Sequence, residues 1–265
     1  MSNKRIVSCT PSTTDFLNLL GLGNNIVGAD DLSMQYPINS EVISVGPIDN
    51  INSHIVSELK PDLVVATETV PGMDVVIDYL KADGHNVLSL HSERFDDLIA
   101  DIYTTGVECD VEELAREIVE KINKKVKRLC SMVRTTDEPL RAYFEWYPDP
   151  FITCGSQSWI SDMLKKAGAN NIFGDIPQPS FDVEEMEIVK RDPQVIFICW
   201  AGQGDELEDL EVENILKRKP WKETAAFKSK QIYYLPESLF AFPGPKLLEG
   251  LELLIELVGI AGSEN

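Results

Sequence analysis

The sequence predicts an α/β protein of two Rossmann-like lobes joined by a single long rigid helix, with a ligand cleft between the lobes. One short pattern occurs in each half of the 265 residues, as GLGNNIVG at 21–28 and AGANNIFG at 167–174. Strand patterns alternate with helical patterns along the chain, which is typical of βαβ units and parallel sheets. Residues 110–134 form a third feature, a helical pattern without glycine or proline. Clefts between lobes commonly bind small ligands.

The N-terminal lobe is expected at 1–109. Residues 4–9 (KRIVSC) are interpreted as a buried strand, and Pro11 ends it before a helix that Ser12 or Thr13 could cap. Continuous apolar runs in the later strands suit parallel strands that are covered on both faces. The elements expected to follow are a strand at 24–30, a short helix at 51–60, a strand at 61–67, a helix from Pro71 to Gly84 and a strand at 86–90.

The helix predicted over 110–134 would be roughly 35 Å long at 1.5 Å per residue. Acidic residues begin it and basic residues end it, which suits the helix dipole. We interpret it as a stiff connector instead of a coiled coil, because its apolar stripe covers only about three heptads. The C-terminal lobe is expected at 135–265. Its expected elements are a strand at 140–146, a loop at 147–157, helices at 158–168 and 181–192, a strand at 193–200, a helix and strand over 218–238 and a terminal helix opened by Pro245.

Composition restricts the partners. Lys and Arg number 24 against 44 Asp and Glu, which gives a formal net charge of −20. Nucleic acid and anionic lipid both require a basic face, so neither is expected as a partner. The acidic side chains either keep the protein soluble or contact basic residues on a protein partner. No apolar run of membrane-spanning length and no signal-peptide pattern occurs. The expected location is extracytoplasmic if a leader precedes Met1, and cytoplasmic otherwise.

Little in the sequence indicates catalysis or a bound metal. There is no GxGxxG after a strand, no Walker A sequence and no GxSxG. The five cysteines include no C-x-x-C, and the three histidines are scattered. We therefore expect no disulfide framework, no metal site, no intrinsic cofactor and no enzymatic activity.

Aromatic residues gather at the ends of predicted strands. In open α/β sheets the ligand crevice lies outside the carboxyl ends of the strands. Exposed aromatic clusters usually indicate binding, and aromatic walls with few charges suit a large, flat, mostly uncharged ligand. The alternative is that these side chains only roof each lobe. They are Tyr36, Trp146, Tyr147, Phe151, Trp159, Trp200, Phe240 and Phe242.

These residues together resemble a known family over essentially the whole chain. The opening RIVSCTPSTTDFLNLLGLGNNIVGAD, the stretch G-x-x-x-W-I-x-x-M-L-x-x-A-G-x-x-N-I-F at 155–173 and the ending FPGPKLLEGLELL are similar to class III substrate-binding proteins of ABC importers. The resemblance implies two α/β lobes joined by one rigid helix and a ligand that is a corrinoid, a ferric siderophore or haem. The P-S-T-T-D loop, Tyr36-Pro37 and E-W-Y-P at 145–148 look most like the branch that binds cobalamin (vitamin B12).

The resemblance also implies a binding site and a partner. A corrinoid would lie between the lobes, and a permease and ATPase complex would receive it from a monomeric binding protein. Acidic residues on each lobe would dock on permease arginines: Asp74 on the first lobe, and Glu206, or else Glu208 or Glu211, on the second. Asp74 is equally interpretable as an ordinary first-turn residue of its helix. The apolar walls would be Tyr36, Trp146, Phe151, Trp200 and Phe242, and the contacts to the ligand's amides would come from groups near Ser12, Thr13, Gly46 and Glu68.

Several alternatives stay open. Siderophore binders are expected to place arginines in the cleft, and here the loops after strands contain almost no arginine. Haem would need an axial ligand, for which Tyr36 or Tyr147 is available. A cytosolic corrinoid carrier would explain the unpaired cysteines. An enzyme on the same scaffold, such as a metal chelatase or a reductase component, would need a ligand set, and the nearest candidates form none: Cys9, Cys154, His91 and Glu68.

Overall fold

The computed structural model describes residues 3–70, 72–134, 136–205 and 209–263. The chain divides into two compact units. Unit 1 comprises Met1–Ser92, Asp96–Lys124 and Pro243–Pro245, and unit 2 comprises Glu93–Phe95, Lys125–Phe242 and Lys246–Asn265.

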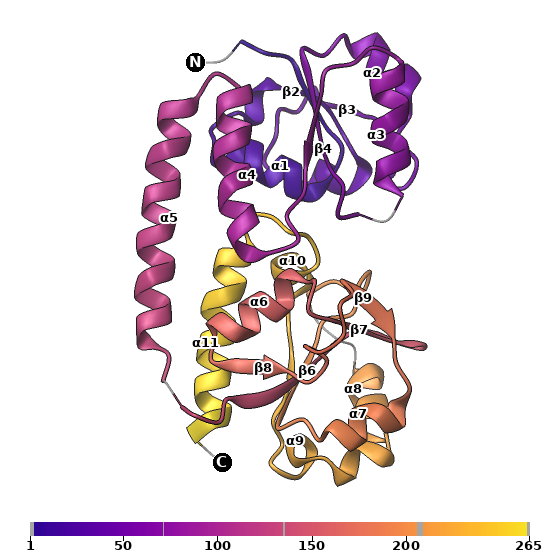
Figure 1. Ribbon diagram of the computed structural model, residues 1–265. Helices are drawn as coiled ribbons and strands as arrows, with labels where there is room; N and C mark the ends of the chain where they lie inside the picture. The colour runs from indigo at the N-terminus through magenta and orange to yellow at the C-terminus, as the bar shows by residue number, and fades with distance from the viewer. Residues whose placement is uncertain (1–2, 71, 135, 206–208, 264–265) are drawn as a thin grey trace. The chain divides into compact units, whose positions relative to one another are not determined.

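Unit 1 contains a five-stranded parallel sheet with the order β3-β2-β1-β4-β5 (Figure 1). Its strands are β1 (Ile6–Ser8), β2 (Ile26–Ala29), β3 (Ile43–Ser44), β4 (Leu63–Thr67) and β5 (Val87–Leu90). The carboxyl ends of all five strands therefore share one edge. The strand order reverses between β1 and β4, and in such sheets this reversal marks the usual ligand crevice.

Helices cover both faces of the unit 1 sheet: α2 and α3 lie on one side in Figure 1, and α1 and α4 on the other. The helices are α1 (Pro11–Leu19), α2 (Ser53–Leu59), α3 (Met73–Ala82) and α4 (Phe95–Glu108), with 3₁₀ turns η1 (Gly23–Asn25) and η2 (Asp31–Gln35). The cap of α1 is Thr10, whose side chain accepts a hydrogen bond from the Thr13 backbone N–H. Sequence reasoning placed this cap at Ser12 or Thr13, which lie inside the helix instead. Pro71, the predicted start of α3, lies outside the described residues.

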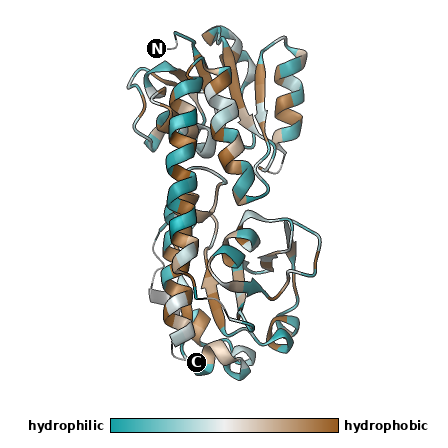
Figure 2. Ribbon diagram, turned by 60° about the vertical axis from the view of Figure 1, so that its left-hand side comes forward, coloured by the Kyte–Doolittle hydropathy of each residue, from teal (hydrophilic) through white to brown (hydrophobic). Residues whose placement is uncertain are grey.

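The helical pattern predicted over 110–134 forms one helix, α5 (Glu112–Met132). It begins later than predicted because Asp110 has a φ of +59°, which turns the chain ahead of the helix. Ala115, Ile122 and Leu129 recur every seven residues and are buried, while most other side chains of α5 are polar (Figure 2). The division between the two units falls within α5, after Lys124.

Unit 2 contains a mixed sheet with the order β11-β10-β6-β7-β9, and β8 pairs with β6 beside β7. The strands are β6 (Leu140–Pro148), β7 (Phe151–Cys154), β8 (Ala169–Asn171), β9 (Ser180–Asp182), β10 (Val195–Ile198) and β11 (Ile232–Tyr234). β8, β6, β10 and β11 pair in parallel, whereas β7 and β9 are antiparallel to their neighbours. The loop predicted at 147–157 was therefore wrong, since β6 and β7 form a hairpin there whose turn holds a cis Asp149–Pro150 bond. β9 likewise replaces the first residues of the helix predicted at 181–192.

Unit 2 is also covered on both faces. The predicted terminal helix is confirmed as α11, which packs with α6, while α7, α8 and α9 contribute to a core on the other face with Tyr143, Ile196 and Trp221. The helices are α6 (Trp159–Lys166), α7 (Glu185–Arg191), α8 (Asp209–Leu216), α9 (Ala225–Lys228), α10 (Glu237–Phe240) and α11 (Leu247–Ser263), with a 3₁₀ turn η3 (Pro220–Glu223). Among the described residues, no helix combines the length and apolarity that crossing a membrane requires.

Candidate functional site

In unit 1, β1 ends in a cluster of buried hydroxyl groups. Ser8 Oγ lies 2.7 Å from Thr13 Oγ1 and 2.8 Å from Thr14 Oγ1. Thr14 Oγ1 donates to Ser33 Oγ at 2.9 Å, and Ser33 Oγ donates in turn to the carboxylate of Asp30. All five residues are fully buried. The network therefore ties the end of β1 and the start of α1 to the loop after β2.

Asp30 ends this network. Its Oδ1 accepts the backbone N–H groups of Leu32 and Ser33, so Asp30 also caps η2. Burial raises the pKa of the Asp30 carboxyl, while the hydrogen bonds from Ser33 oppose that rise. Every polar group here finds its partner inside the protein, so the cluster is a rigid support at the switch point of the sheet.

Ser12 and Thr13 belong to this support. Thr13 Oγ1 donates to the Thr10 carbonyl at 2.9 Å, and Ser12 Oγ lies 3.1 Å from Thr10 Oγ1. Both side chains are fully buried. Their hydroxyls build the loop between β1 and α1, so their predicted contacts with a ligand stay predictions.

The other predicted unit 1 residues are more accessible. Gly46 has a φ of +103°, and a Cβ there would lie 2.9 Å from the Asn50 carbonyl oxygen, so only glycine suits this turn. Glu68 follows β4 and is exposed; it accepts a hydrogen bond from Ser89 Oγ, and its other oxygen lies 3.3 Å from His91 Nδ1. Tyr36 is half-buried at the end of η2.

In unit 2, a fully buried carboxylate organises the carboxyl edge of β6 and β10. Glu145 Oε1 and Oε2 accept hydrogen bonds from Arg218 Nη1 at 3.0 and 2.8 Å. Trp200 Nε1 donates to Oε1 at 2.8 Å, and the Tyr143 hydroxyl donates to Oε2 at 3.3 Å. Burial raises the pKa of the Glu145 carboxyl, whereas the charge of Arg218 opposes that rise. The negative charge of Glu145 and the positive charge of Arg218 therefore compensate each other inside unit 2.

Aromatic rings surround the guanidinium of Arg218. Its Cζ lies 4.3 Å from the ring centroid of Trp221, 4.9 Å from that of Phe151 and 5.9 Å from that of Trp200. Such cation–π contacts gain strength when the cation is shielded from water, and the Arg218 side chain is only 11% exposed. Trp200, predicted as a ligand wall, is itself 4% exposed and joins the hydrophobic core of unit 2.

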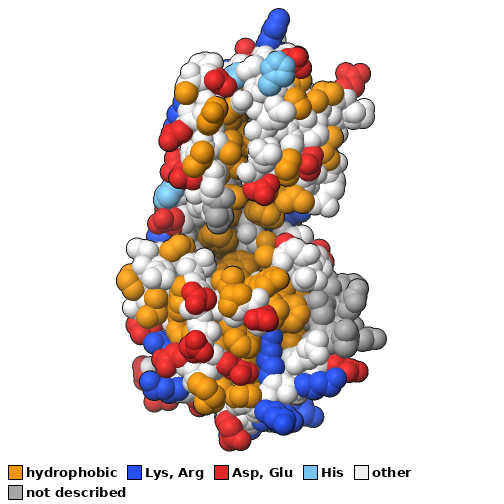
Figure 3. All heavy atoms as spheres, turned by 90° about the vertical axis from the view of Figure 1, so that its right-hand side faces the viewer, with side chains coloured by type: hydrophobic (Ala, Val, Ile, Leu, Met, Phe, Trp, Pro, Cys, Tyr) orange, Lys and Arg blue, Asp and Glu red, His pale blue; other side chains and the backbone are white. Residues whose placement is uncertain are grey.

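A second aromatic group lies on the neighbouring part of the same sheet. The ring centroids of Phe144 and Trp146 are 4.6 Å apart, and those of Trp146 and Trp159 are 6.1 Å apart. Trp159 Nε1 donates to the Phe240 carbonyl at 3.1 Å, which fixes its ring. Trp146 is half-buried, as are two other predicted residues, Phe151 and Phe242. Figure 3 shows hydrophobic side chains gathered on one face of unit 2, with charged side chains beside them.

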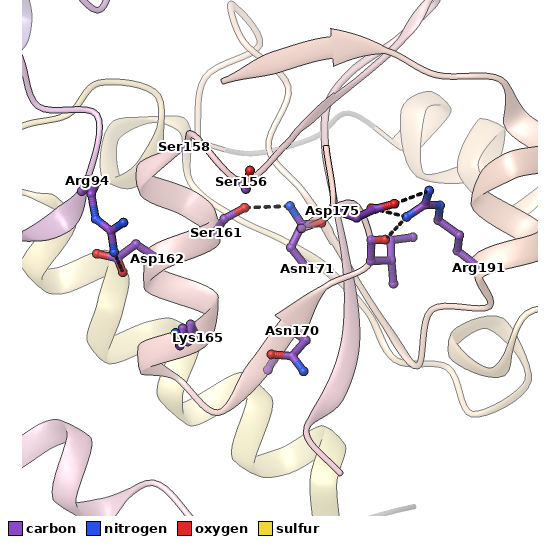
Figure 4. A pocket seen from close by; sticks show the side chains of 13 residues that line it. Arg94, Ser156, Ser158, Ser161, Asp162, Lys165, Asn170, Asn171, Asp175 and Arg191 are labelled. Atoms are coloured by element: carbon purple, nitrogen blue, oxygen red, sulfur yellow. Dashed lines mark hydrogen bonds and ion pairs between the residues drawn. The ribbon is translucent and has the colours of Figure 1, made fainter. Parts of the chain in front are cut away.

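A separate pocket of about 580 Å³ in unit 2 is lined mainly by polar and charged residues (Figure 4). Its charged side chains are mostly paired, since Arg94 lies 3.2 Å from Asp162 and Arg191 holds Asp175 through two nitrogens. None of the predicted ligand-binding residues lines it. Serine and asparagine groups complete the wall, so this pocket does not suit an apolar macrocycle.

The predicted docking residue Asp74 is exposed in the first turn of α3. No hydrogen bond or ion pair joins it to another described residue. Next to it, Val75 and Tyr79 are 61% and 66% exposed, which is unusual for large apolar side chains. They border a groove of about 460 Å³ between α3 and residues 49–53. Glu206 and Glu208 lie outside the described residues, as does the side chain of Glu211.

The described residues contain no group of three or more His, Cys, Asp or Glu side chains that could hold a metal ion. Burial raises the pKa of the Cys9 and Cys154 thiols to about 12, so both are protonated at neutral pH. A protonated thiol is neither a good nucleophile nor a metal ligand. Of the four candidates that we named for an enzyme, the two thiols are therefore unreactive, and His91 pairs with Glu68.

Comparison with known proteins agrees with this architecture. A family model described as "Periplasmic binding protein" matches residues 6–239. The uncharacterized ABC transporter substrate-binding lipoprotein YvrC of Bacillus subtilis is 30% identical over 261 residues, which is 96% of this chain and 80% of the relative. The vitamin B12-binding protein of Vibrio cholerae is 23% identical over 97% of this chain and 90% of the relative.

Solved structures share the fold. The V. cholerae vitamin B12-binding protein BtuF superposes with a TM-score of 0.82 at 23% identity, covering 98% of both chains. A possible iron-binding periplasmic solute-binding protein of Staphylococcus epidermidis also reaches 0.82, at 26% identity, covering 97% of this chain and 99% of the other. The two predicted α/β lobes are thus confirmed. The chain belongs to the periplasmic binding protein family and is a non-enzymatic substrate-binding component of an ABC transporter.

Proposed function

We propose that this protein binds cobalamin or a related corrinoid outside the cytoplasm and delivers it to the permease of an ABC importer. The observation that carries the proposal is the set of partly exposed rings on unit 2, where Trp146 and Phe151 lie at the carboxyl edge of β6. The nearby buried charges, Glu145 and Arg218, compensate each other. An apolar, electrically balanced surface suits a large flat ligand with uncharged side chains.

Two relatives support the proposal. One is named a vitamin B12-binding protein and matches 97% of this chain. The other is named a lipoprotein, which supports a location outside the cytoplasmic membrane. In unit 1, the exposed Glu68 and the backbone at Gly46 supply polar groups for the amides of a corrinoid.

Calorimetric titration of the purified protein with cyanocobalamin and cobinamide tests the proposal. We expect saturable 1:1 binding that Trp146→Ala weakens at least tenfold, because the loss of a ring contact removes roughly 1.5 kcal/mol or more. Tyr79→Ala is the matched control, since this exposed ring lies on α3 of unit 1 and should leave the affinity unchanged. If neither corrinoid binds while haem or a ferric siderophore does, the corrinoid proposal is wrong.

Haem is the second candidate, and one observation favours it. Tyr147 is 40% exposed at the end of β6, directly after Trp146, and a phenol can serve as an axial ligand of haem iron. Titration with haemin would give an absorbance change that Tyr147→Phe abolishes if this residue coordinates the iron. Unchanged haemin spectra in the variant would remove Tyr147 from consideration.

We also propose that Asp74 docks on basic residues of the permease. Its carboxylate has no partner among the described residues, and the exposed Val75 and Tyr79 provide apolar contact area beside it. Buried charge pairs with an apolar surround are common in specific interfaces. The proposed second docking residue, Glu206, would act in the same way.

Transport assays separate docking from ligand binding. Asp74→Lys should abolish ligand delivery to the reconstituted transporter while calorimetry finds unchanged affinity for the ligand. Asp83→Lys, at the other end of α3, is the control and should transport normally. Normal transport by the Asp74 variant would exclude the docking role.

A further inference from the structure

Arg218 uses only part of its hydrogen-bonding capacity. Both bonds to Glu145 come from Nη1, and Nε and Nη2 donate to no described residue. Neither nitrogen is among the fully buried side-chain atoms that lack a partner in the described residues, so both keep contact with solvent, where a ligand could reach them. The Arg218 side chain as a whole is only 11% exposed. Unused donors on a mostly buried cation are the feature that a polar ligand group would complete.

The position of Arg218 matches the usual binding edge of an α/β sheet. Glu145 is in register with Ile198, the last residue of β10, and Trp200 follows two residues later. Phe151, over whose ring Arg218 lies, pairs with Pro148, the last residue of β6. Glu145, Trp200 and Phe151, three of the residues that contact Arg218, therefore lie at or near the carboxyl ends of β6 and β10, the edge at which such sheets bind ligands.

We infer that Arg218 is a ligand-recognition residue whose Nε and Nη2 donate to an uncharged acceptor, such as a carboxamide carbonyl, and that Glu145 sets this preference. The inference rests on the proposed function, since the side chains of a corrinoid carry such amides. The sequence has almost no arginine in the loops after strands, which we took as evidence against siderophores. Arg218 follows α8 in the sequence, but its side chain lies at this edge of the sheet. Because Glu145 compensates its charge, its presence there does not favour a negatively charged ligand.

The preference follows from charge compensation. Glu145 already neutralises Arg218 in surroundings made of aromatic rings, where charges interact strongly. A ligand carboxylate would add a second negative charge next to Glu145, and like charges in a water-poor site repel each other. An amide carbonyl accepts the same hydrogen bonds without this repulsion. Removing the charge of Glu145 should therefore change the preference of the site from amides to carboxylates.

The experiment compares cyanocobalamin with its monocarboxylates, in which one side-chain amide is hydrolysed, in wild type and Glu145→Gln. We expect wild type to bind the amide form more tightly than at least one monocarboxylate, by about tenfold, because adverse charge pairs reduce affinity by this order. Glu145→Gln should shift that ratio toward the carboxylate by about tenfold or more. The ratio is measured within one variant, so a loss of folded protein cancels.

Two further variants sharpen the test. Arg218→Lys keeps a positive charge beside Glu145 but loses the planar donors, so its affinity for cyanocobalamin should fall about tenfold. Arg141→Lys is the control, because Arg141 forms an exposed pair with Asp192 elsewhere in unit 2. Two results would overturn the inference while corrinoid binding stands. One is wild-type affinity for cyanocobalamin in Arg218→Lys. The other is a ratio of amide to monocarboxylate affinity that changes by less than about twofold between wild type and Glu145→Gln, for every monocarboxylate. Absence of binding to both forms by wild type would overturn the proposed function and the inference together.

Discussion

Arg218→Met should strongly destabilise unit 2, because it removes one partner of a buried ion pair. Methionine replaces most of the apolar part of the arginine side chain, so the change removes mainly the charge. Glu145 would then stay fully buried with only Trp200 and Tyr143 as hydrogen-bond donors. Breaking a buried ion pair by removing one partner costs roughly 3–5 kcal/mol, because the other charge is left uncompensated.

The contacts with the rings contribute to the same loss. Shielded cation–π contacts are worth about 0.5–2 kcal/mol, and this overlaps with the cost of breaking the pair. We therefore expect the free energy of unfolding of unit 2 to fall by about 3–5 kcal/mol in total. Urea unfolding followed by circular dichroism, with hydrogen exchange to assign the transition to unit 2, measures this change.

Arg141→Met provides the comparison on the protein surface. Arg141 pairs with Asp192 at 2.9 Å, but both side chains are about half exposed, so their separation should cost only about 0–1 kcal/mol. Glu145→Gln combined with Arg218→Met should recover part of the loss, because no uncompensated charge remains. If Arg218→Met destabilises no more than Arg141→Met, the argument that a compensated buried pair organises this edge is refuted.

Three smaller effects follow from other contacts. Gly106→Ala would place a Cβ 2.2 Å from that of Ala115. The cost of overpacking, about 1–3 kcal/mol, should exceed the gain in helix propensity of about 1 kcal/mol. The melting temperature should therefore fall, and Ala115→Gly in the same chain should restore it. Arg191 lowers the pKa of the Asp175 carboxyl, and a lowered folded-state pKa contributes stability that is lost as pH falls. Arg191→Ala should thus lower the melting temperature at pH 7, with a gap from wild type that narrows below pH ~4; a constant gap would contradict this. Cys130 is the half-buried cysteine, so it should react with a thiol reagent well before the four buried ones, and five equal rates would contradict the burial.

The sequence predicts best those elements whose neighbours enforce the pattern. β4 and β10 are covered on both faces, so their continuous apolar runs predicted them well. β7 was missed because its four residues follow Pro148 and Pro150, and proline usually indicates a loop. α4 received no prediction, although Phe95, Leu98 and Ile102 repeat at helical spacing and are buried.

The residues that organise the site were harder to predict. An acidic residue inside the apolar run RAYFEW indicates a buried carboxylate, so Glu145 was within reach of sequence reasoning. Its partner Arg218 is 73 residues away and follows a charged helix, where an arginine looks like an ordinary solvent-exposed residue. The same limit applies to Asp30 and Ser33, because a hydroxyl network is defined by side-chain directions that periodicity does not specify.

The balance of charge at the unit 2 edge is the reason to favour a neutral ligand over an anionic one. The chain as a whole carries a formal charge of −20, so a dianionic haem or a multiply charged ferric siderophore approaches against an unfavourable field. Arg218 does not reverse this field locally, because Glu145 already holds its charge. What the edge offers is ring surface and unused N–H donors, which bind uncharged acceptors on a flat ligand without requiring an opposite charge. A corrinoid with amide side chains presents that combination, and Glu145→Gln is the change that would remove the advantage.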